Sequence, residues 1–155
     1  MKIYGHPLPE KLYQIIKDKE PDELPILTIS MLRRVVPADV QIGGGAVGGL
    51  RVNNLAGIKR ESAPYRLIDK QINELYGIDS SKNTGKPITK LSILDVDKSL
   101  FIAGNHDEET IALDYRNNPQ IPCVRGSFIS NIAEWILLAD TFTEFAIKVG
   151  LLEER

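Results

Sequence analysis

The sequence predicts an α+β fold: a single domain with a twisted, mainly antiparallel sheet bordered by helices at the N-terminus, in the middle and at the C-terminus. Two observations lead to this prediction. Helical patterns open and close the chain of 155 residues, and short apolar segments separated by polar turns fill much of the region between them. Helices segregated from a run of strands are typical of α+β domains. The length suits one domain, residues 1–155, that buries a core without a disulfide or a structural metal.

The N-terminal half combines helical patterns with one glycine-rich segment. Residues Leu8–Lys19 predict a helix, because their apolar positions recur every three to four residues. The segment Ile26–Val36 fits a buried helix or a strand, and we favour the helix. In Gln41–Asn54 the glycines indicate a flexible turn that enters a strand, since the helix and the Lys-Ser or Lys-Thr pair of a phosphate loop do not follow. Residues Ser62–Tyr76 predict an interior helix capped by its first residue.

The segment Leu100 to Val124 is the most informative part of the chain. Its polar clusters separate three apolar or alternating runs, which predicts a meander of three strands. In the second strand, Ile111 and Leu113 share a face with Tyr115. We expect that face to pack against two phenylalanines of the final helix. The strands are expected at Leu100–Ala103, Thr110–Tyr115 and Ile121–Val124, and the phenylalanines are Phe142 and Phe145.

Further elements flank the meander on both sides. Residues Ile88–Val96 predict a strand, and Glu134–Ala139 fit a buried strand or the start of a helix. Thr141 and Glu144 have the spacing of a capping box, so we expect the final helix to begin there. Gly150 is a typical residue for closing it.

Composition restricts the functional classes. The net charge of −2 argues against a nucleic-acid partner. Residues 31–90 carry a charge of +5 and residues 91–155 a charge of −6, so the C-terminal part suits a basic partner. No apolar segment resembles a signal peptide or reaches membrane-spanning length, which predicts a cytoplasmic protein without a membrane partner. The single cysteine, Cys123, fits a small buried hydrophobe.

The candidates for catalysis are weak. Residues His106–Glu109 offer an imidazole and three carboxylates, but consecutive residues on a turn do not converge on one ion and His6 is the only other histidine. Asp95, Asp97 and Asp114 would suit acid–base chemistry only if burial or pairing shifted their pKa values, which a sequence does not reveal. We therefore predict no catalytic residue, no metal and no cofactor, and a protein that is not an enzyme. A small hydrolase with an unrecognised site remains a third option.

Two blocks of the C-terminal half resemble the SUKH superfamily, which joins yeast cell-wall-synthesis regulators of the Smi/Knr type with many bacterial immunity proteins. The first block is SLFIAGNHDEETIALDYR, in which a strand, a polar hairpin tip and a strand ending in Leu-Asp precede Ile-Pro-Cys-Val. The second is LLADTFTEFAIKVGL, which is similar to the closing segment of the family. The resemblance covers residues 88–152, whereas the N-terminal half departs from the family pattern.

The resemblance implies an α+β domain that acts by binding. Bacterial members serve as cytoplasmic antidotes encoded beside a toxin, which is often a nuclease, and they inhibit by occluding the toxin. A regulatory protein–protein interaction module of the cell-wall type is the alternative. For either function we expect a protein partner, here a cognate toxin domain, near the polar residues of the meander. The candidate contact residues are Asp107, Glu108, Glu109, Asp114, Tyr115 and Arg116.

Overall fold

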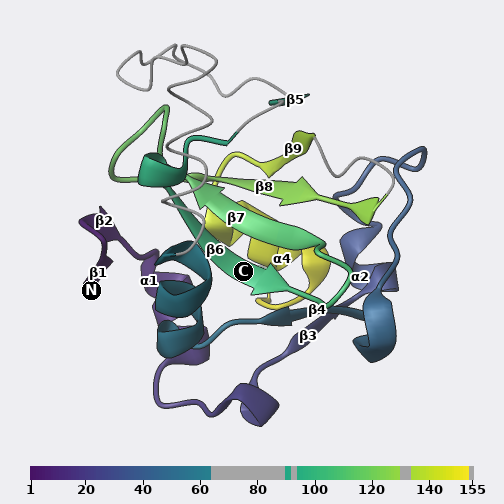
Figure 1. Cartoon of the computed structure of the whole chain (residues 1–155), viewed down its shortest axis with the longest axis horizontal. Coiled ribbons are helices and arrows are strands. Elements are labelled where there is room, and N and C mark those ends of the chain that lie inside the picture. The colour runs from purple at the N-terminus through teal and green to yellow at the C-terminus, as the bar shows by residue number, and fades with distance from the viewer. Residues whose placement is uncertain (64–89, 92–93, 130–133, 154–155) are drawn as a thin grey trace.

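An antiparallel sheet of seven strands forms the centre of the computed structural model, which describes residues 1–63, 90–91, 94–129 and 134–153 (Figure 1). The strand order is β3-β4-β6-β7-β8-β9-β5, and every neighbouring pair runs antiparallel. The strands are β3 (Ile26–Thr28), β4 (Gly49–Val52), β5 (Lys90–Leu91), β6 (Ser99–Gly104), β7 (Thr110–Asp114), β8 (Cys123–Ser127) and β9 (Trp135–Ala139).

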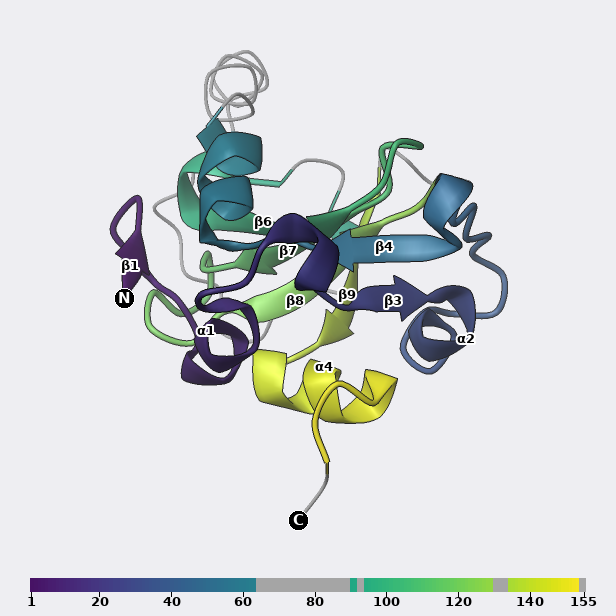
Figure 2. The ribbon, with the colours of Figure 1, turned by 90° about the horizontal axis from the view of Figure 1, so that it is seen from below.

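Helices lie on both faces of this sheet. Figure 2 shows α1 (Glu10–Ile16), α2 (Ile29–Leu32) and α4 (Phe142–Val149) on one face, and the helical residues 55–63 on the other. Short 3₁₀ turns lie at η1 (Pro21–Glu23), η2 (Gly45–Val47) and η3 (Val96–Lys98). The architecture confirms the predicted α+β domain with an antiparallel sheet. Within the described ranges, no helix has the length and hydrophobicity needed to cross a bilayer.

The main hydrophobic core lies between the sheet and α1, α2 and α4. Ile111, Leu113 and Tyr115 of the meander belong to the same buried cluster as Phe142 and Phe145 of α4. This confirms the predicted packing of the β7 face against the final helix. Burying one such side chain contributes about 1.5–3 kcal/mol, so this contact anchors the C-terminus of the chain to the sheet.

A second, smaller cluster covers the other face of the central strands. It contains Leu94, Phe101 and Ala112, and the partly buried Trp135 packs against it. The rings of Phe101 and Trp135 are 5.8 Å apart between centroids. Because both faces are covered here, β8 is buried at every position and β6 and β7 at all but one each. Residues on both faces of these strands are therefore excluded from solvent.

The last two elements form as their residue patterns indicate. The segment Glu134–Ala139 was expected to form a strand or the start of a helix, and its residues Trp135–Ala139 form the strand β9. The hydroxyl oxygen of Thr141 accepts a hydrogen bond from the Glu144 amide at 3.1 Å, and Gly150 ends α4 with a φ of 90°. Both boundaries of the final helix are therefore confirmed.

Of the helix expected over Ile26–Val36, only Ile29–Leu32 forms an α-helix, and residues 33–36 form a turn and a bend. Residues Ile26–Thr28 form β3, which pairs with β4, and α2 begins only at Ile29. Thr28 ends β3 and is the N-cap of α2, because its side chain accepts a hydrogen bond from the Met31 amide at 3.3 Å. Pairing with a neighbouring strand thus overrides the helical spacing of the apolar residues.

The interior helix begins earlier than predicted. Residues 55–63 are already helical, and the Asn54 side chain accepts a hydrogen bond from the Gly57 amide at 2.8 Å. Ser62 is therefore not the N-cap. Its hydroxyl oxygen instead accepts a hydrogen bond from the Phe101 amide at 3.1 Å, which fastens this helix to β6. The rest of the predicted helix, residues 64–76, lies outside the described residues.

Three further predictions differ in their boundaries. The predicted helix Leu8–Lys19 is shorter as α1, and it ends before Asp18, whose φ is +57°. Within Ile88–Val96, residues 90–91 form β5, and residues 88–89 and 92–93 lie outside the described part of the chain. The third meander strand begins at Cys123 rather than Ile121, because Ile121 is exposed in a turn.

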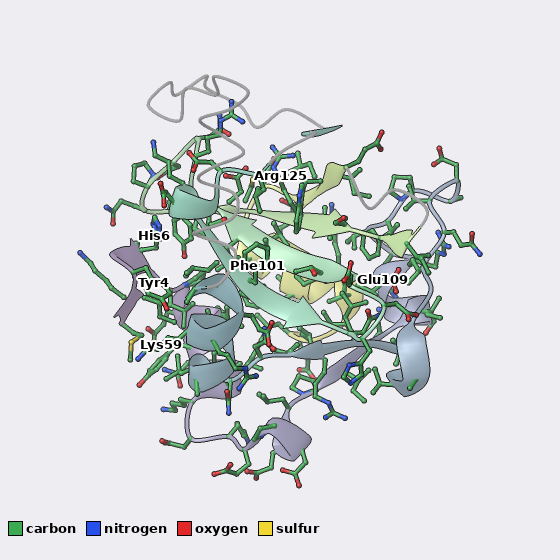
Figure 3. The ribbon with its side chains drawn as sticks, viewed as in Figure 1. Tyr4, His6, Lys59, Phe101, Glu109 and Arg125 are labelled. Atoms are coloured by element: carbon green, nitrogen blue, oxygen red, sulfur yellow. The ribbon has the colours of Figure 1, made fainter. Side chains whose placement is uncertain are left out.

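A small hairpin at the N-terminus was not predicted. Its strands, β1 (Lys2–Ile3) and β2 (His6–Pro7), are joined by Tyr4 and Gly5, which have φ values of +52° and +81°. The Tyr4 hydroxyl donates to the Lys59 carbonyl at 2.9 Å. The hairpin is thereby joined to the helical residues 55–63 (Figure 3).

Candidate functional site

The six predicted contact residues lie in two separate places. Asp107, Glu108 and Glu109 form the tip between β6 and β7, whereas Asp114, Tyr115 and Arg116 lie at the opposite end of β7. Figure 3 shows this separation, since Glu109 lies at one end of the hairpin and His6, which stacks on the Tyr115 ring, lies at the other. The residues therefore do not form one contact surface.

The hairpin tip presents two exposed carboxylates in a fixed conformation. Asp107 and Glu108 are exposed. The side-chain oxygen of Asn105 accepts hydrogen bonds from the Asp107 amide at 3.0 Å and the Glu109 amide at 3.1 Å. Glu108 has a φ of +64°, a left-handed conformation that is unfavourable for a residue with a side chain. The tip is thus held by its own hydrogen bonds.

Glu109 is buried, so its predicted role as a partner contact is wrong. Its side chain is 0% exposed. One carboxylate oxygen accepts hydrogen bonds from the Gly44 amide at 2.7 Å and the Asn105 side-chain amide at 2.9 Å. The other accepts from the amides of Gly43 at 2.8 Å and Ile129 at 3.1 Å. These four donors leave the carboxylate no free face and join the glycine-rich loop to the hairpin tip.

The ionised form of Glu109 is favoured by this environment. Burial raises the pKa of the carboxyl group, but the hydrogen bonds from Gly43, Asn105, Gly44 and Ile129 together lower it below its ordinary value of 4.5. A lowered pKa in the folded protein means that the ionised carboxylate stabilises the fold above pH 4.5, and that this stabilisation is lost as the pH falls through the folded-state pKa.

Replacing Glu109 by glutamine tests this junction. The amide –NH₂ of E109Q would face backbone N–H donors, so we expect the free energy of unfolding to fall by about 2 kcal/mol at pH 7. The difference from the wild type should shrink below pH 4.5, because the wild-type carboxylate then becomes protonated. Urea unfolding at several pH values measures both effects. The exposed neighbour provides the control: E108Q should change the stability by less than about 0.5 kcal/mol. Equal effects of the two variants would contradict the assignment.

Asp114, another of the candidate contact residues, is also buried. Its side chain and that of Arg125 are 0% and 1% exposed, and the two form an ion pair of 2.7 Å. The Cys123 thiol lies 3.8 Å from the same carboxylate oxygen. Burial, followed by the charge of Asp114, raises the pKa of Cys123 to about 12, so this thiol is protonated at neutral pH. The cluster belongs to the interior of the sheet.

Tyr115 is enclosed by the N-terminal hairpin, in agreement with the burial expected for its face of β7, so it offers little surface to a partner. The His6 ring stacks on it with centroids 4.7 Å apart, and its hydroxyl donates to the Pro7 carbonyl at 2.7 Å. Burial raises the pKa of Tyr115. Arg116 is partly exposed at this end of β7, far from the hairpin tip along the strand.

The buried ion pair gives a second stability test. We expect D114N to lower the free energy of unfolding by about 3 kcal/mol or more, because it leaves the buried Arg125 charge uncompensated. Thermal or urea unfolding measures the loss. In the double variant D114L/R125M much of this loss should be recovered, because both charges are removed together. A D114N protein as stable as the exposed control D107N would refute the role of the pair.

A groove of about 360 Å³ opens beside the hairpin tip. It is lined by Phe101 and Ala103 of β6, which are almost fully buried, by Glu61 of the helical residues 55–63 and by Val47 of η2. Glu108 lies on its rim. In Figure 2 the helical residues 55–63 lie on the sheet face opposite to α4. The exposed carboxylate of Glu108 and residues of β6 therefore line the same groove.

An irregularity in β6 accompanies this groove. The register between β6 and β7 shifts between Phe101 and Ala103. Asn53 donates hydrogen bonds to two backbone carbonyls at this irregularity. Its backbone amide donates to the Ile102 carbonyl at 2.8 Å, and its side-chain amide donates to the Phe101 carbonyl at 3.2 Å. Such bulges are frequent beside binding sites, where they redirect side chains.

The sequence pattern did not predict the groove. Its lining comes from β4, η2, the helical residues 55–63 and the β6–β7 hairpin, which are distant in sequence. The only available signal was the glycine-rich segment, since Gly44 and Gly45 have φ values of +78° and +60° that favour glycine. Across the described ranges, no three His, Cys, Asp or Glu side chains are grouped so as to hold a metal ion.

Comparisons with protein-family models, with curated proteins and with solved structures find no match to this chain. The geometry of the site and the residue patterns therefore carry the functional argument.

Proposed function

We propose that this chain is a non-enzymatic binding protein, and specifically an immunity protein that neutralises a cognate toxin by occluding it. The observation that carries the proposal is the exposed acidic tip, Asp107 and Glu108, held rigidly beside an open groove. The resemblance of residues 88–152 to the SUKH superfamily supports the same class. The α+β fold agrees with what that resemblance implies.

The charge of the tip suits a toxin that acts on nucleic acid. A nuclease presents basic side chains to bind phosphate groups, and an acidic surface competes for the same positive charges. Complementary potentials of this kind mainly raise the association rate and the specificity of a complex. An electrostatic complex also weakens when salt screens the charges. The proposed partner is therefore a basic toxin domain, bound at the hairpin tip.

A rigid tip favours tight binding. Asn105 and Glu109 hold the tip and the glycine-rich loop together before any partner arrives. Association usually costs free energy because flexible loops and side chains become ordered, and a preformed surface avoids part of this cost. The strained φ of Glu108 is in keeping with a surface selected for binding.

Co-expression with the product of the neighbouring gene tests the proposed function. A toxin that copurifies with this chain, and whose activity the chain blocks, is the expected result. If the neighbour is not a toxin, and the chain instead binds enzymes or regulators of the cell wall, the regulatory module is the better assignment. Hydrolysis by the purified chain, at a site that alanine substitutions abolish, would contradict both binding functions.

Charge reversal tests the proposed contact surface. In the copurifying complex, D107K/E108K should weaken binding by about tenfold or more at low salt, because attraction becomes repulsion. The wild-type affinity should fall with rising salt and that of the variant should not. Calorimetric titration measures both. E153K reverses an exposed charge just after α4, on the opposite side of the sheet, and is the matched control. Equal affinities of all three proteins would refute the placement.

A further inference from the structure

We propose that the groove between η2 and the helical residues 55–63 binds an extended segment of the protein partner that carries two basic side chains separated by small apolar residues. This inference relies on the proposed function in taking the ligand to be part of a protein. It adds a second contact region to the hairpin tip and specifies the chemistry of the segment that enters it.

The shape and the lining of the groove favour a short, partly apolar segment. Its volume of about 360 Å³ lies in the lower part of the range of ligand-binding clefts. Its apolar lining includes Phe101 and Ala103 of β6, which are almost fully buried, and Ala46 and Val47 of η2, which are exposed. Val47 is 38% exposed, so a partner would remove apolar surface from water by covering it.

The charges at the groove favour a basic ligand. Glu61 and Glu108 are both exposed and both line the groove. Arg51 also lines it, but its guanidinium points toward the Pro21 and Leu24 carbonyls, at 3.4 and 3.3 Å. This cation is therefore partly satisfied by the chain itself. Glu61 forms an ion pair with Arg60 at 3.3 Å, in which the two side chains are 47% and 71% exposed, and an ion pair this exposed is weak because water screens it. The carboxylate of Glu108 extends into solvent.

The two carboxylates belong to elements that meet β6 at different points along its length. Glu61 precedes Ser62, which is hydrogen-bonded to Phe101 of β6, and Glu108 lies in the tip that follows Gly104. Phe101 and Gly104 are three residues apart, or about 10 Å at the rise of a strand. In a segment with the polyproline II conformation, side chains three residues apart lie on the same side of the chain, about 9 Å from one another. Two lysines or arginines at this spacing would each meet one carboxylate, with their aliphatic stems along the exposed apolar side chains of η2.

Exposed apolar residues extend this surface beyond the groove. Three of the six large, exposed hydrophobic side chains of the described chain gather at the glycine-rich loop. A Cβ added to Gly44 would lie 2.8 Å from Cδ1 of Ile29, and one added to Gly43 would lie 3.3 Å from Cδ1 of Ile129. The third is Val47 itself. A protein partner would cover this apolar rim while its basic segment occupies the groove, whereas a small ligand would leave it exposed.

Two peptides test the groove without the toxin. The probes are the acetylated tetrapeptide amides Lys-Ala-Val-Lys and Glu-Ala-Val-Glu, titrated into the full ¹⁵N-labelled chain. We expect the basic peptide to shift the amide resonances of residues 45–47 and 101–105 with saturation near about 1 mM, a typical scale for a short peptide. The acidic peptide should not shift them. Equal shifts from both peptides, shifts confined to other residues, or no saturable shift would each overturn the proposal.

Two tryptophan variants test the groove in the toxin complex. A46W places a large side chain on the groove wall, so we expect it to weaken toxin binding at least tenfold. A56W carries the same substitution at an exposed helical position outside the groove lining and should bind as the wild type. E61K should also weaken binding, and circular dichroism checks that each variant is folded. If the toxin binds A46W and E61K as tightly as A56W, the groove proposal fails while the proposed function stands. If no toxin copurifies, the proposed function fails, and the peptide titration still decides the groove.

Discussion

The hydrogen-bonded carboxylate of Glu109 is the interaction on which the proposed binding surface depends. It joins the amides of Gly43 and Gly44 to the β6–β7 hairpin and to the residues after β8. Removing a carboxylate from water is costly unless hydrogen bonds replace the lost hydration, and four donors do so here. Because two of the four donors are consecutive backbone amides of the loop, the position of the loop follows from the position of one side chain.

The two faces of the sheet have different roles. The face toward α1, α2 and α4 carries the main core and supplies most of the buried apolar surface. The other face is closed in the middle by the Phe101 cluster and by the Asp114–Arg125 ion pair, and it opens into the groove toward the hairpin tip. The N-terminal hairpin closes the far end of the meander by stacking His6 on Tyr115. Half of the large exposed hydrophobic side chains of the described residues, Ile29, Val47 and Ile129, lie at the glycine-rich loop beside the groove.

The sequence predicted the fold better than the site, for physical reasons. The capping pattern of Thr141 and Glu144 and the alternation around Leu113 depend on neighbouring residues, so they were predictable locally. The strand β3 depends on pairing with a distant strand, and its apolar spacing was equally suited to a helix. At the site, Glu109 and Glu108 are adjacent acidic residues in a polar turn, yet one is buried and one exposed. Only the three-dimensional position of the Gly43–Gly44 amides distinguishes them.

The central claim is that one buried carboxylate holds the hairpin tip, the glycine-rich loop and the groove wall as a single surface. Hydrogen exchange at the Gly43, Gly44 and Ile129 amides, compared between the wild type and E109Q at pH 7, tests it most directly. The account predicts strong protection of all three amides in the wild type and a selective loss in E109Q, with the amides of α4 still protected. Rapid exchange of these amides in the wild type, or equal protection in both proteins, would contradict it.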